Sequence, residues 1–204
     1  MNTSTKLQVV NSLLTSIGED PVNTLGTGLD DEIVAESIVD EVTRKVLIRG
    51  WSWNTEESFK IVRQVDDTIT VPSNFLSIDF HNTNLVLRGN RIYDKQNNSY
   101  KLQSDVTCST VIVGLPWEEI PEAARQFILY SAGRIFQQRQ VGSRTLYEFS
   151  LKDESEAWAT LTGNEEATSN LSIFQNQELA LMTDRSSGRA VVDYMPGSIF
   201  GSIS

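Results

Sequence analysis

The sequence predicts an α+β fold. Apolar residues recur at helical spacing up to residue 50 and again from residue 116, whereas the chain between them alternates in short strand-like runs separated by turn residues. Beyond residue 183, glycine and proline interrupt the chain repeatedly. We therefore expect an antiparallel bundle of about four helices with an inserted antiparallel β-sheet or small barrel and an extended arm. The expected bounds are 1–50 and 116–182 for the helical bundle, 51–115 for the β subdomain and 183–204 for the C-terminal arm.

Composition limits the class of protein. Of 204 residues, 39% are hydrophobic and 22% charged, as in globular proteins. The net charge of −10 argues against a protein that grips nucleic acid, because phosphate contacts need Lys and Arg, but it suits a surface past which DNA slides. No apolar run approaches the roughly 18 residues of a membrane-spanning helix, so no membrane contact is expected. The single cysteine, Cys108, is expected in the core and fits a reducing cytoplasm.

Two helices are expected before residue 50. Thr3 or Ser4 can cap the first helix, and Gly18 ends it. The second helix starts with acidic residues at 30–32 and ends near Arg49, a polarity that complements the helix dipole. The residues expected on the buried stripes are Leu7, Val10, Leu14 and Ile17 in the first helix, and Val34, Ile38, Val42 and Val46 in the second. The exposed ion pairs expected on the second helix are Asp40–Arg44 and Glu41–Lys45.

A tryptophan pair marks the change from helix to strands. Arg49 and Gly50 read as a helix end, and Trp51 and Trp53 would face the same side of a following strand. We interpret the pair as a structural junction that packs the sheet against the helices, with both rings largely buried and neither in contact with DNA. The alternative is a stacking platform for a base or a sugar.

Short strands are expected throughout the inserted segment. Turn residues at 66–67, 88–90 and 96–98 separate them. The expected strands are 59–64, 68–71, 84–89, 91–94, 99–103 and 107–113. The loops expected to be most exposed are 64–68, 81–84 and 95–99.

Two further helices follow the strands. Pro121 suits the first turn of the third helix, which Gly142 ends, and Ser143 caps the fourth. The residues expected on the buried face of the third helix are Ala124, Phe127, Ile128, Ser131, Ile135 and Phe136. Those of the fourth helix are Leu146, Phe149, Leu151, Ala157, Trp158 and Leu161. The fourth helix also has an expected exposed acidic face of Glu148, Asp153, Glu154 and Glu156, which reads first as a solvated face. Past Gly163 the pattern weakens, and residues 171–182 extend this helix or form another.

The C-terminal arm combines chain breakers with apolar residues, and a purely disordered tail seldom contains so many. The apolar residues are Val191, Val192, Tyr194, Met195, Ile199 and Phe200. We interpret the arm as a segment that orders on a partner. Fully extended, it could reach about 70 Å, far enough to touch another subunit.

Catalytic motifs are missing from the sequence. There is no G-x-S-x-G, H-E-x-x-H, P-loop or C-x-x-C pattern, and the single histidine, His81, stands apart from any nucleophile motif. The segment Gly26–Gly28 lacks the third glycine and the preceding strand of a dinucleotide loop. We expect no enzyme activity, no metal and no cofactor. The enzymatic alternative is a glycan hydrolase that uses a carboxylate pair, but adjacent acidic residues are common in an acidic protein and do not define a cleft.

Two stretches of the chain resemble a known family. They are VNSLLTSIGEDPVNTL (Val10 to Leu25) and IRGWSWNTEE (Ile48 to Glu57). Their pattern of SIGE-x-PV-x-TL, a helix and then RGW-x-x-N-x-E resembles tail tubular protein A, the head-to-tail adaptor of short-tailed, podovirus-type bacteriophages. VPSNFLSID (Val71 to Asp79) and PWEEIPEAARQFILYSAGRIFQQR (Pro116 to Arg139) extend the resemblance to about residues 7–165.

The resemblance implies a structural virion protein of the viral tail. Such adaptors form a ring of twelve between the portal protein and the tail nozzle protein, tail tubular protein B, with tail fibres attached near the adaptor–nozzle joint. The genome leaves through this ring without sequence-specific binding, and assembly takes place in the host bacterial cytoplasm. On this basis the arm is expected to bind the portal or a neighbouring subunit, and the acidic face of the fourth helix to line the channel. A tail-associated glycan hydrolase is the alternative.

Overall fold

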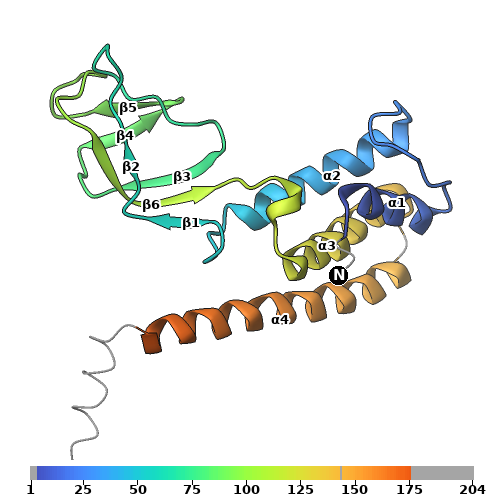
Figure 1. Ribbon diagram of the computed structural model, residues 1–204. Coiled ribbons are helices and arrows are strands. Elements are labelled where there is room, and N and C mark those ends of the chain that lie inside the picture. Colours follow the sequence, from blue (N-terminus) through green and yellow to red (C-terminus); the bar gives the residue numbers. More distant parts are fainter. Residues whose placement is uncertain (1–3, 143, 176–204) are drawn as a thin grey trace, which may run out of the picture. The chain divides into compact units, whose positions relative to one another are not determined.

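The fold is α+β, as the sequence predicts, in a computed structural model that describes residues 4–142 and 144–175 (Figure 1). The chain divides into two compact units, residues 1–166 and 167–204, and the strands and the first three helices belong to the first unit. The helices are α1 (Lys6–Ile17), α2 (Asp30–Leu47), α3 (Glu122–Gln140) and α4 (Arg144–Gln175), with a 3-10 turn η1 (Trp117–Glu119) before α3. The strands are β1 (Thr55–Glu57), β2 (Lys60–Ile61), β3 (Phe75–Phe80), β4 (Leu85–Arg88), β5 (Arg91–Asp94) and β6 (Val106–Val113).

Helix α1 begins with a capping box on Thr5. The Thr5 side chain accepts a hydrogen bond from the Gln8 amide, and the Gln8 side chain accepts one from the Thr5 amide. The expected cap at Thr3 or Ser4 is therefore wrong. Ser4 instead donates its hydroxyl to Glu122 of α3, which ties the start of the chain to another helix. Gly18, with a φ of 91°, ends α1 in the left-handed conformation.

The loop between α1 and α2 is held by two side chains that hydrogen-bond its backbone. Asn11 both donates to the Val22 carbonyl and accepts from the Val22 amide, each at 2.9 Å. Glu32 accepts from the Gly26 amide at 2.6 Å, and its other oxygen accepts from the Thr27 hydroxyl and the Gly28 amide. These bonds, the Thr27 hydroxyl first, outweigh desolvation and hold the pKa of Glu32 below its ordinary value. The glycines of this loop therefore surround a carboxylate of their own chain.

Helix α2 carries its charges as predicted, with Asp30, Asp31 and Glu32 in the first turn and Arg44 and Lys45 in the last. Its buried face is broader than the predicted stripe because α1 and α3 both pack against it. The buried residues are Glu32, Ala35, Ile38, Val39, Val42, Val46 and Leu47, whereas Val34, expected inside, is exposed. Glu41 pairs with Lys45 as predicted, but Asp40 pairs with Lys6 of α1 at 2.8 Å rather than with Arg44.

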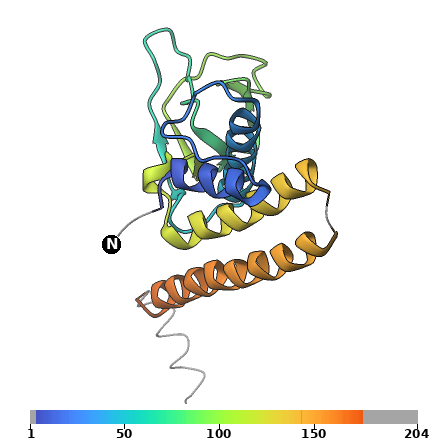
Figure 2. The same ribbon diagram turned by 90° about the vertical axis from the view of Figure 1, so that its right-hand side faces the viewer.

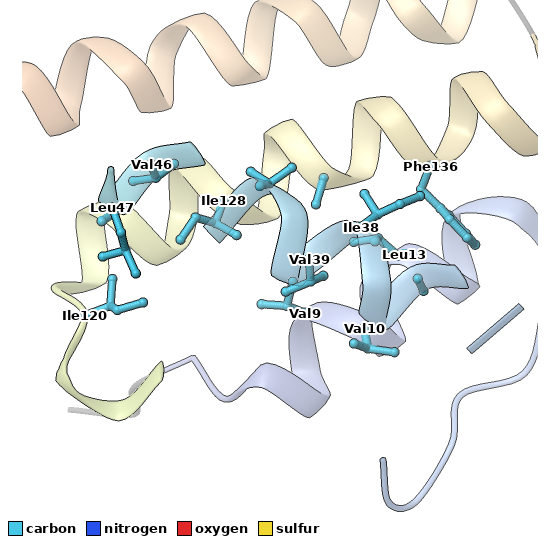
Figure 3. Packing of buried hydrophobic residues seen from close by; sticks show 14 of the residues in the cluster. Val9, Val10, Leu13, Ile38, Val39, Val46, Leu47, Ile120, Ile128 and Phe136 are labelled. Carbon is cyan, nitrogen blue, oxygen red and sulfur yellow. The ribbon is translucent and has the colours of Figure 1, made fainter. Parts of the chain in front are cut away.

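Helix α3 follows Pro121 and packs against both α1 and α2 (Figure 2). The three helices share one hydrophobic core, in which Phe136 of α3 lies beside Leu13 of α1 and Ile38 of α2, and Ile128 of α3 lies toward Val46 of α2 (Figure 3). Of the residues expected on the α3 face, Ala124, Ile128, Ser131 and Phe136 are buried, and Phe127 and Ile135 are half-buried. The additional buried residues of α3 are Arg125 and Ala132.

Arg125 is a buried cation at the start of α3 that binds backbone oxygens. Its guanidinium donates to the carbonyls of Ile120 at 2.7 Å, Glu118 at 2.8 Å and Ser4 at 3.2 Å. A buried charge is tolerated when hydrogen bonds satisfy its donors. Arg125 thereby fixes the N-terminal segment and η1 against the helical core.

Helix α4 continues through Gly163, past the point where the sequence pattern weakens. Ala157 and Leu161 are buried and Trp158 is half-buried, as expected, but Leu151 is exposed, contrary to expectation. Ser143 and the side chains of Leu146 and Phe149 lie outside the described residues. Little of the described part of α4 is buried, so a few contacts hold it against α3.

Strand β6 is the centre of the main sheet. It pairs antiparallel with β1, β2 and β3, while β4 and β5 form a separate hairpin. The β3 strand is not among the expected strands, and two expected strands reduce to single bridges, Thr70 to Arg91 and Ser99 to Asp94. The second hydrophobic core lies among these strands and consists of Ile61, Ile69, Val71, Ile92, Leu102, Val106, Cys108 and Val111.

The buried residues thus form two clusters, one among the helices and one among the strands. Described residues of 1–50 and 116–166 supply the first cluster, with Trp51, and 61–111 supply the second. The division into a helical bundle (1–50 and 116–182) and an inserted subdomain (51–115) stays a prediction. The arm of residues 183–204 lies outside the described residues.

Truncating either core should test whether the two unfold together. Ile92→Ala in the strand core and Ile128→Ala in the helical core should each lower the free energy of unfolding by about 2–5 kcal/mol. All four tryptophans contact the helical cluster, so their fluorescence reports on that core. We expect Ile92→Ala to shift the fluorescence transition in urea as well, because Asn54 hydrogen-bonds both α2 and β6 and so couples the cores. An unchanged fluorescence transition beside a shifted circular dichroism transition would show independent cores.

Candidate interaction surfaces

The junction between α2 and β1 is organised around Trp51. Its indole nitrogen donates to the Val46 carbonyl at 2.8 Å, and the ring is buried. Trp53 stacks on it with ring centroids 6.2 Å apart, and Trp158 of α4 meets it edge-on at 5.7 Å. The expected strand through these residues is wrong, because residues 52–54 form a turn and β1 starts at Thr55. The two rings are neighbours through this turn rather than through strand alternation.

Asn54 joins three segments at the junction. Its side-chain amide donates to the carbonyls of Leu47 in α2 at 2.9 Å and Val113 in β6 at 3.0 Å, and its side-chain oxygen accepts from the Trp51 amide at 2.7 Å. Its backbone carbonyl also accepts from the Val113 amide at 2.8 Å. The side chain is buried and all its polar contacts are internal, so it fixes the direction in which the sheet leaves the helices.

Gly50 and Arg49 complete the junction. Gly50 has a φ of 74°, and a Cβ there would stand 2.9 Å from a methyl group of Ile112, so only glycine fits without displacement. The Arg49 guanidinium lies over the Trp158 ring, 4.5 Å from its centroid. Helix α4 adds a second contact, because Glu165 accepts from the amide and the hydroxyl of Ser52 at 2.7 and 3.0 Å.

The exposure of the two tryptophan rings distinguishes the structural junction from the stacking platform. The Trp51 ring is enclosed by its own chain, whereas Trp53 is half-buried. A stacking platform needs open ring faces, and one face of each ring is taken by the other. The contacts therefore favour the structural junction over the platform.

The carboxylates on the acidic face of α4 have different partners, and Glu156 pairs with Lys152 of the same helix at 3.8 Å. Glu148, Asp153 and Glu156 are exposed, but the side chain of Glu154, at 13% exposure, forms an ion pair with Arg134 of α3. Glu154 is therefore not on the exposed face where the sequence pattern put it. Burial raises the pKa of Glu154, yet hydrogen bonds from Arg134 and Ser131 outweigh it and hold that pKa below its ordinary value. This carboxylate attaches α4 to α3.

A groove of about 450 Å³ runs beside this ion pair, between α3 and α4. Asp153 and Glu156 line one side and Glu122 and Tyr130 the other. The carboxylates give the groove a negative rim, which repels phosphate groups.

The three loops expected to be most exposed lie around one hollow of about 550 Å³. Loops 81–84 and 95–99 are joined by a hydrogen bond from Asn84 to Gln96 at 3.0 Å, and the Lys95 amide donates to the Asn84 carbonyl. Loop 64–68 is joined to the segment at Leu102, whose amide donates to the Asp67 carbonyl at 2.8 Å. We call residues 62–68, 81–84 and 95–105 the distal loops.

Strand register places the loops at 62–68 and 101–105 away from the junction. Val113, at one end of β6, is bonded to Asn54, whereas Val106, at the other end, pairs with Ile61 just before the loop at 62–68. The seven-residue rise between them corresponds to roughly 23 Å along the strand. The expected strands at 84–89 and 91–94 already bring loops 81–84 and 95–99 together as the two ends of the β4–β5 hairpin, whereas the joining of loop 64–68 to Leu102 has no signal in the sequence.

The described part of the chain offers few groups for metal binding or catalysis. No group of three or more His, Cys, Asp or Glu side chains there could hold a metal ion, and no described helix is long and apolar enough to span a membrane. His81 is exposed in a bend. Sequence reasoning gave no role to Asn54 beyond the RGW-x-x-N-x-E pattern that contains it, and none to Arg125.

The remaining sequence-predicted site residues, Val191, Val192, Tyr194, Met195, Ile199 and Phe200, lie outside the described residues. A family model described as tail tubular protein matches residues 7–171, most of the chain. The chain belongs to the tail tubular protein family of podophages. As a member it is a structural component of the phage virion, located in the tail and assembled with other tail and portal components. No curated protein matches the chain.

The family resemblance now has a structural explanation at RGW-x-x-N. In this tail tubular protein, Arg49 covers Trp158, Gly50 provides the left-handed turn beside Ile112, Trp51 fills the core and Asn54 bonds helix to sheet. Each letter of the pattern corresponds to a contact at the junction.

Replacing Asn54 should loosen the junction. Asn54→Ala leaves the buried carbonyls of Leu47 and Val113 without their side-chain donor, and we expect a loss of about 3 kcal/mol or more in the free energy of unfolding. Asn23→Ala, an exposed asparagine in the α1–α2 loop, is the control and should change little. Urea denaturation followed by fluorescence measures both. Equal stabilities for the two variants would mean that Asn54 does not hold the junction.

The Glu154–Arg134 pair should contribute stability in a pH-dependent way. Glu154→Gln should cost about 2 kcal/mol near neutral pH, since Arg134 loses a charged partner in a part-buried site. Because the folded-state pKa of Glu154 is depressed, the wild-type advantage is complete above its ordinary pKa and disappears as pH falls through the lower, folded-state pKa. Thermal unfolding across this range measures it, with the exposed Glu156→Gln as control. A difference that persisted undiminished in acid would contradict the ion pair as its source.

Proposed function

We propose that the chain is the head-to-tail connector adaptor, which forms a ring between the portal protein and the tail nozzle protein. The observation that carries this proposal is the junction, where Asn54 and Trp51 fix a helical core and a strand core in one chain. A connector must bind two different partners at a set geometry, and two cores with a tight joint meet that need. Family membership supports a tail location for both contacts.

In this proposal the two ends of the chain have different partners. The helical bundle and the arm of 183–204 contact the portal or a neighbouring subunit, and the distal loops contact the nozzle. The hydrogen bonds among the distal loops, such as Asn84 to Gln96 and Leu102 to Asp67, support this by keeping a polar face in one conformation before binding. The twelve-membered ring, tail-fibre attachment beside the nozzle and assembly in the host bacterial cytoplasm follow from the family resemblance.

The channel-lining role is proposed for the exposed members of the acidic face, namely Glu148, Asp153 and Glu156. A negative wall repels phosphates, so DNA passes without sticking. Glu154 takes no part, because its carboxylate is occupied by Arg134. A solvated outer face is the competing placement for the same residues, and an imaged ring with these carboxylates on its outer rim would overturn the channel role.

The glycan-hydrolase alternative finds little support in the electrostatics. Such an enzyme needs one carboxyl group kept protonated by a raised pKa. Among the described residues, every carboxyl group with a clear shift has its pKa lowered, including Asp66, which accepts from the side chain and the backbone amide of Thr68, and Asp105, which accepts from the Arg63 amide and pairs with Lys60. A carboxyl group with a lowered pKa is ionised near neutral pH, so it accepts hydrogen bonds and does not serve as the proton donor that a hydrolase needs. The tail tubular protein family consists of structural virion proteins, which also argues against a hydrolase.

Deleting residues 183–204 should separate folding from assembly. The described fold ends before this segment, so the truncated chain should keep its circular dichroism spectrum and unfolding transition. It should fail to join purified portal particles, whereas the full chain should close a ring on them that electron microscopy resolves. A matched control keeps the length and changes Val191, Val192, Tyr194, Met195, Ile199 and Phe200 to serine, and should fail in the same way. Normal ring formation by the truncated chain would overturn the arm's role.

A further inference from the structure

Two valines near the end of the strand core are open to solvent. Val62 is 66% exposed, and Val65 is 105% exposed, as much as in a free peptide. Both lie in the distal loop that follows β2, which we call the distal tip and define as residues 62–67. Val65 contributes no burial to its own fold, and turn positions normally carry polar residues or glycine. Packing within its own fold therefore does not explain Val65 in this turn, whereas contact with a partner would.

The distal tip is held in one conformation by hydrogen bonds at its base. The Gln64 amide donates to the Thr68 carbonyl at 2.8 Å, and the Asp67 amide donates to the Gln64 carbonyl at 3.1 Å. The Arg63 side chain pairs with Asp67, and the Arg63 amide donates to Asp105 at 3.0 Å. The valines are therefore presented by an ordered turn, so little conformational entropy would be lost when a partner covers them.

The charges around the distal tip leave one carboxylate open. Arg63 pairs with Asp67, and Lys60 pairs with Asp105 at 2.8 Å. Asp66 accepts from the Thr68 amide and hydroxyl through Oδ1, while Oδ2 accepts no hydrogen bond from the described residues. Arg91 of β5 is close enough for its charge to act on Asp66. The tip thus presents apolar side chains next to a partly compensated carboxylate whose Oδ2 is open to a donor.

We propose that the distal tip is an apolar anchor: Val62 and Val65 insert into an apolar pocket of a protein partner, and a cationic side chain at the rim of that pocket meets Asp66. At this contact the net charge of −10 favours a partner that carries cations over a second copy of this chain, and the copies of the proposed ring meet through the helical bundle and the arm. The inference rests on the proposed function, in which the partner at the distal loops is the nozzle protein. Val62 and Val65 anchor the contact with the nozzle protein, and the surface that receives them is an apolar pocket with a cationic rim.

The test uses the double variant Val62→Ser/Val65→Ser in the full chain, assembled on purified portal particles, with nozzle protein titrated onto them. Each valine that becomes fully buried should account for about a tenfold change in affinity or more, so the dissociation constant should rise by about a hundredfold. Portal joining and thermal stability should stay at wild-type values, because both side chains are exposed. The control is Leu87→Ser on β4, an apolar residue that is 39% exposed and lies outside both the distal loops and the helical bundle, and it should leave nozzle affinity unchanged.

The outcomes separate the two proposals. Wild-type particles that bind no nozzle protein would overturn the proposed function together with the anchor. Nozzle binding by wild type and the double variant with equal affinity would overturn the anchor alone. Impaired ring closure on the portal in the double variant would show that a neighbouring copy covers the valines, which also overturns it. Weaker nozzle binding by the wild type at high salt is expected from the Asp66 contact.

Discussion

The hydrogen bonds of one buried side chain, Asn54, are what the rest of the structure depends on. They reach the last turn of α2 and the end of β6, and thereby join two hydrophobic cores that share few other contacts. Removing a donor from two buried carbonyls costs more than forming the bonds contributes, so the joint tolerates little change. Trp51 fills the space behind it, and Gly50 lets the chain turn sharply enough for Asn54 to reach both partners.

The two cores are built and supported differently. In the helical core, broad apolar faces meet around Phe136 and Ile128, and a buried cation, Arg125, fastens the start of the chain by three carbonyls. The strand core is smaller, and turns and side-chain caps such as Asp66 on Thr68 supplement its ladder hydrogen bonds. Helix α4 belongs fully to neither core. It is attached by Ala157 and Leu161, by the Arg134–Glu154 pair, by Arg49 over Trp158 and by Glu165 on Ser52.

The α+β class, the helices and many of the buried positions can be predicted from sequence, because each depends on residues that are close together in the chain. Helical periodicity and terminal charge are properties of one segment, which is why the charges at both ends of α2 can be predicted. The errors arise where distant residues decide. Glu154 looks exposed in the sequence because its partner is twenty positions away. The β3 strand is a different case, because Leu76, Ile78 and Phe80 alternate with Ser77 and Asp79, so its local pattern is available and predicts a strand, which the expected strands omit. The joining of loop 64–68 to Leu102 depends on a long-range backbone hydrogen bond from Leu102 to Asp67, which no local pattern encodes.

The loop between α1 and α2 has a consequence for contact with nucleic acid. A run of backbone amides around glycines is the usual cradle for phosphate. Here the amides of Gly26 and Gly28 and the hydroxyl of Thr27 are already satisfied by Glu32, which remains ionised because its pKa is depressed. The chain thus supplies its own resident anion. A passing polyanion finds these donors occupied and meets a like charge behind them, so the cradle is permanently blocked to nucleic acid.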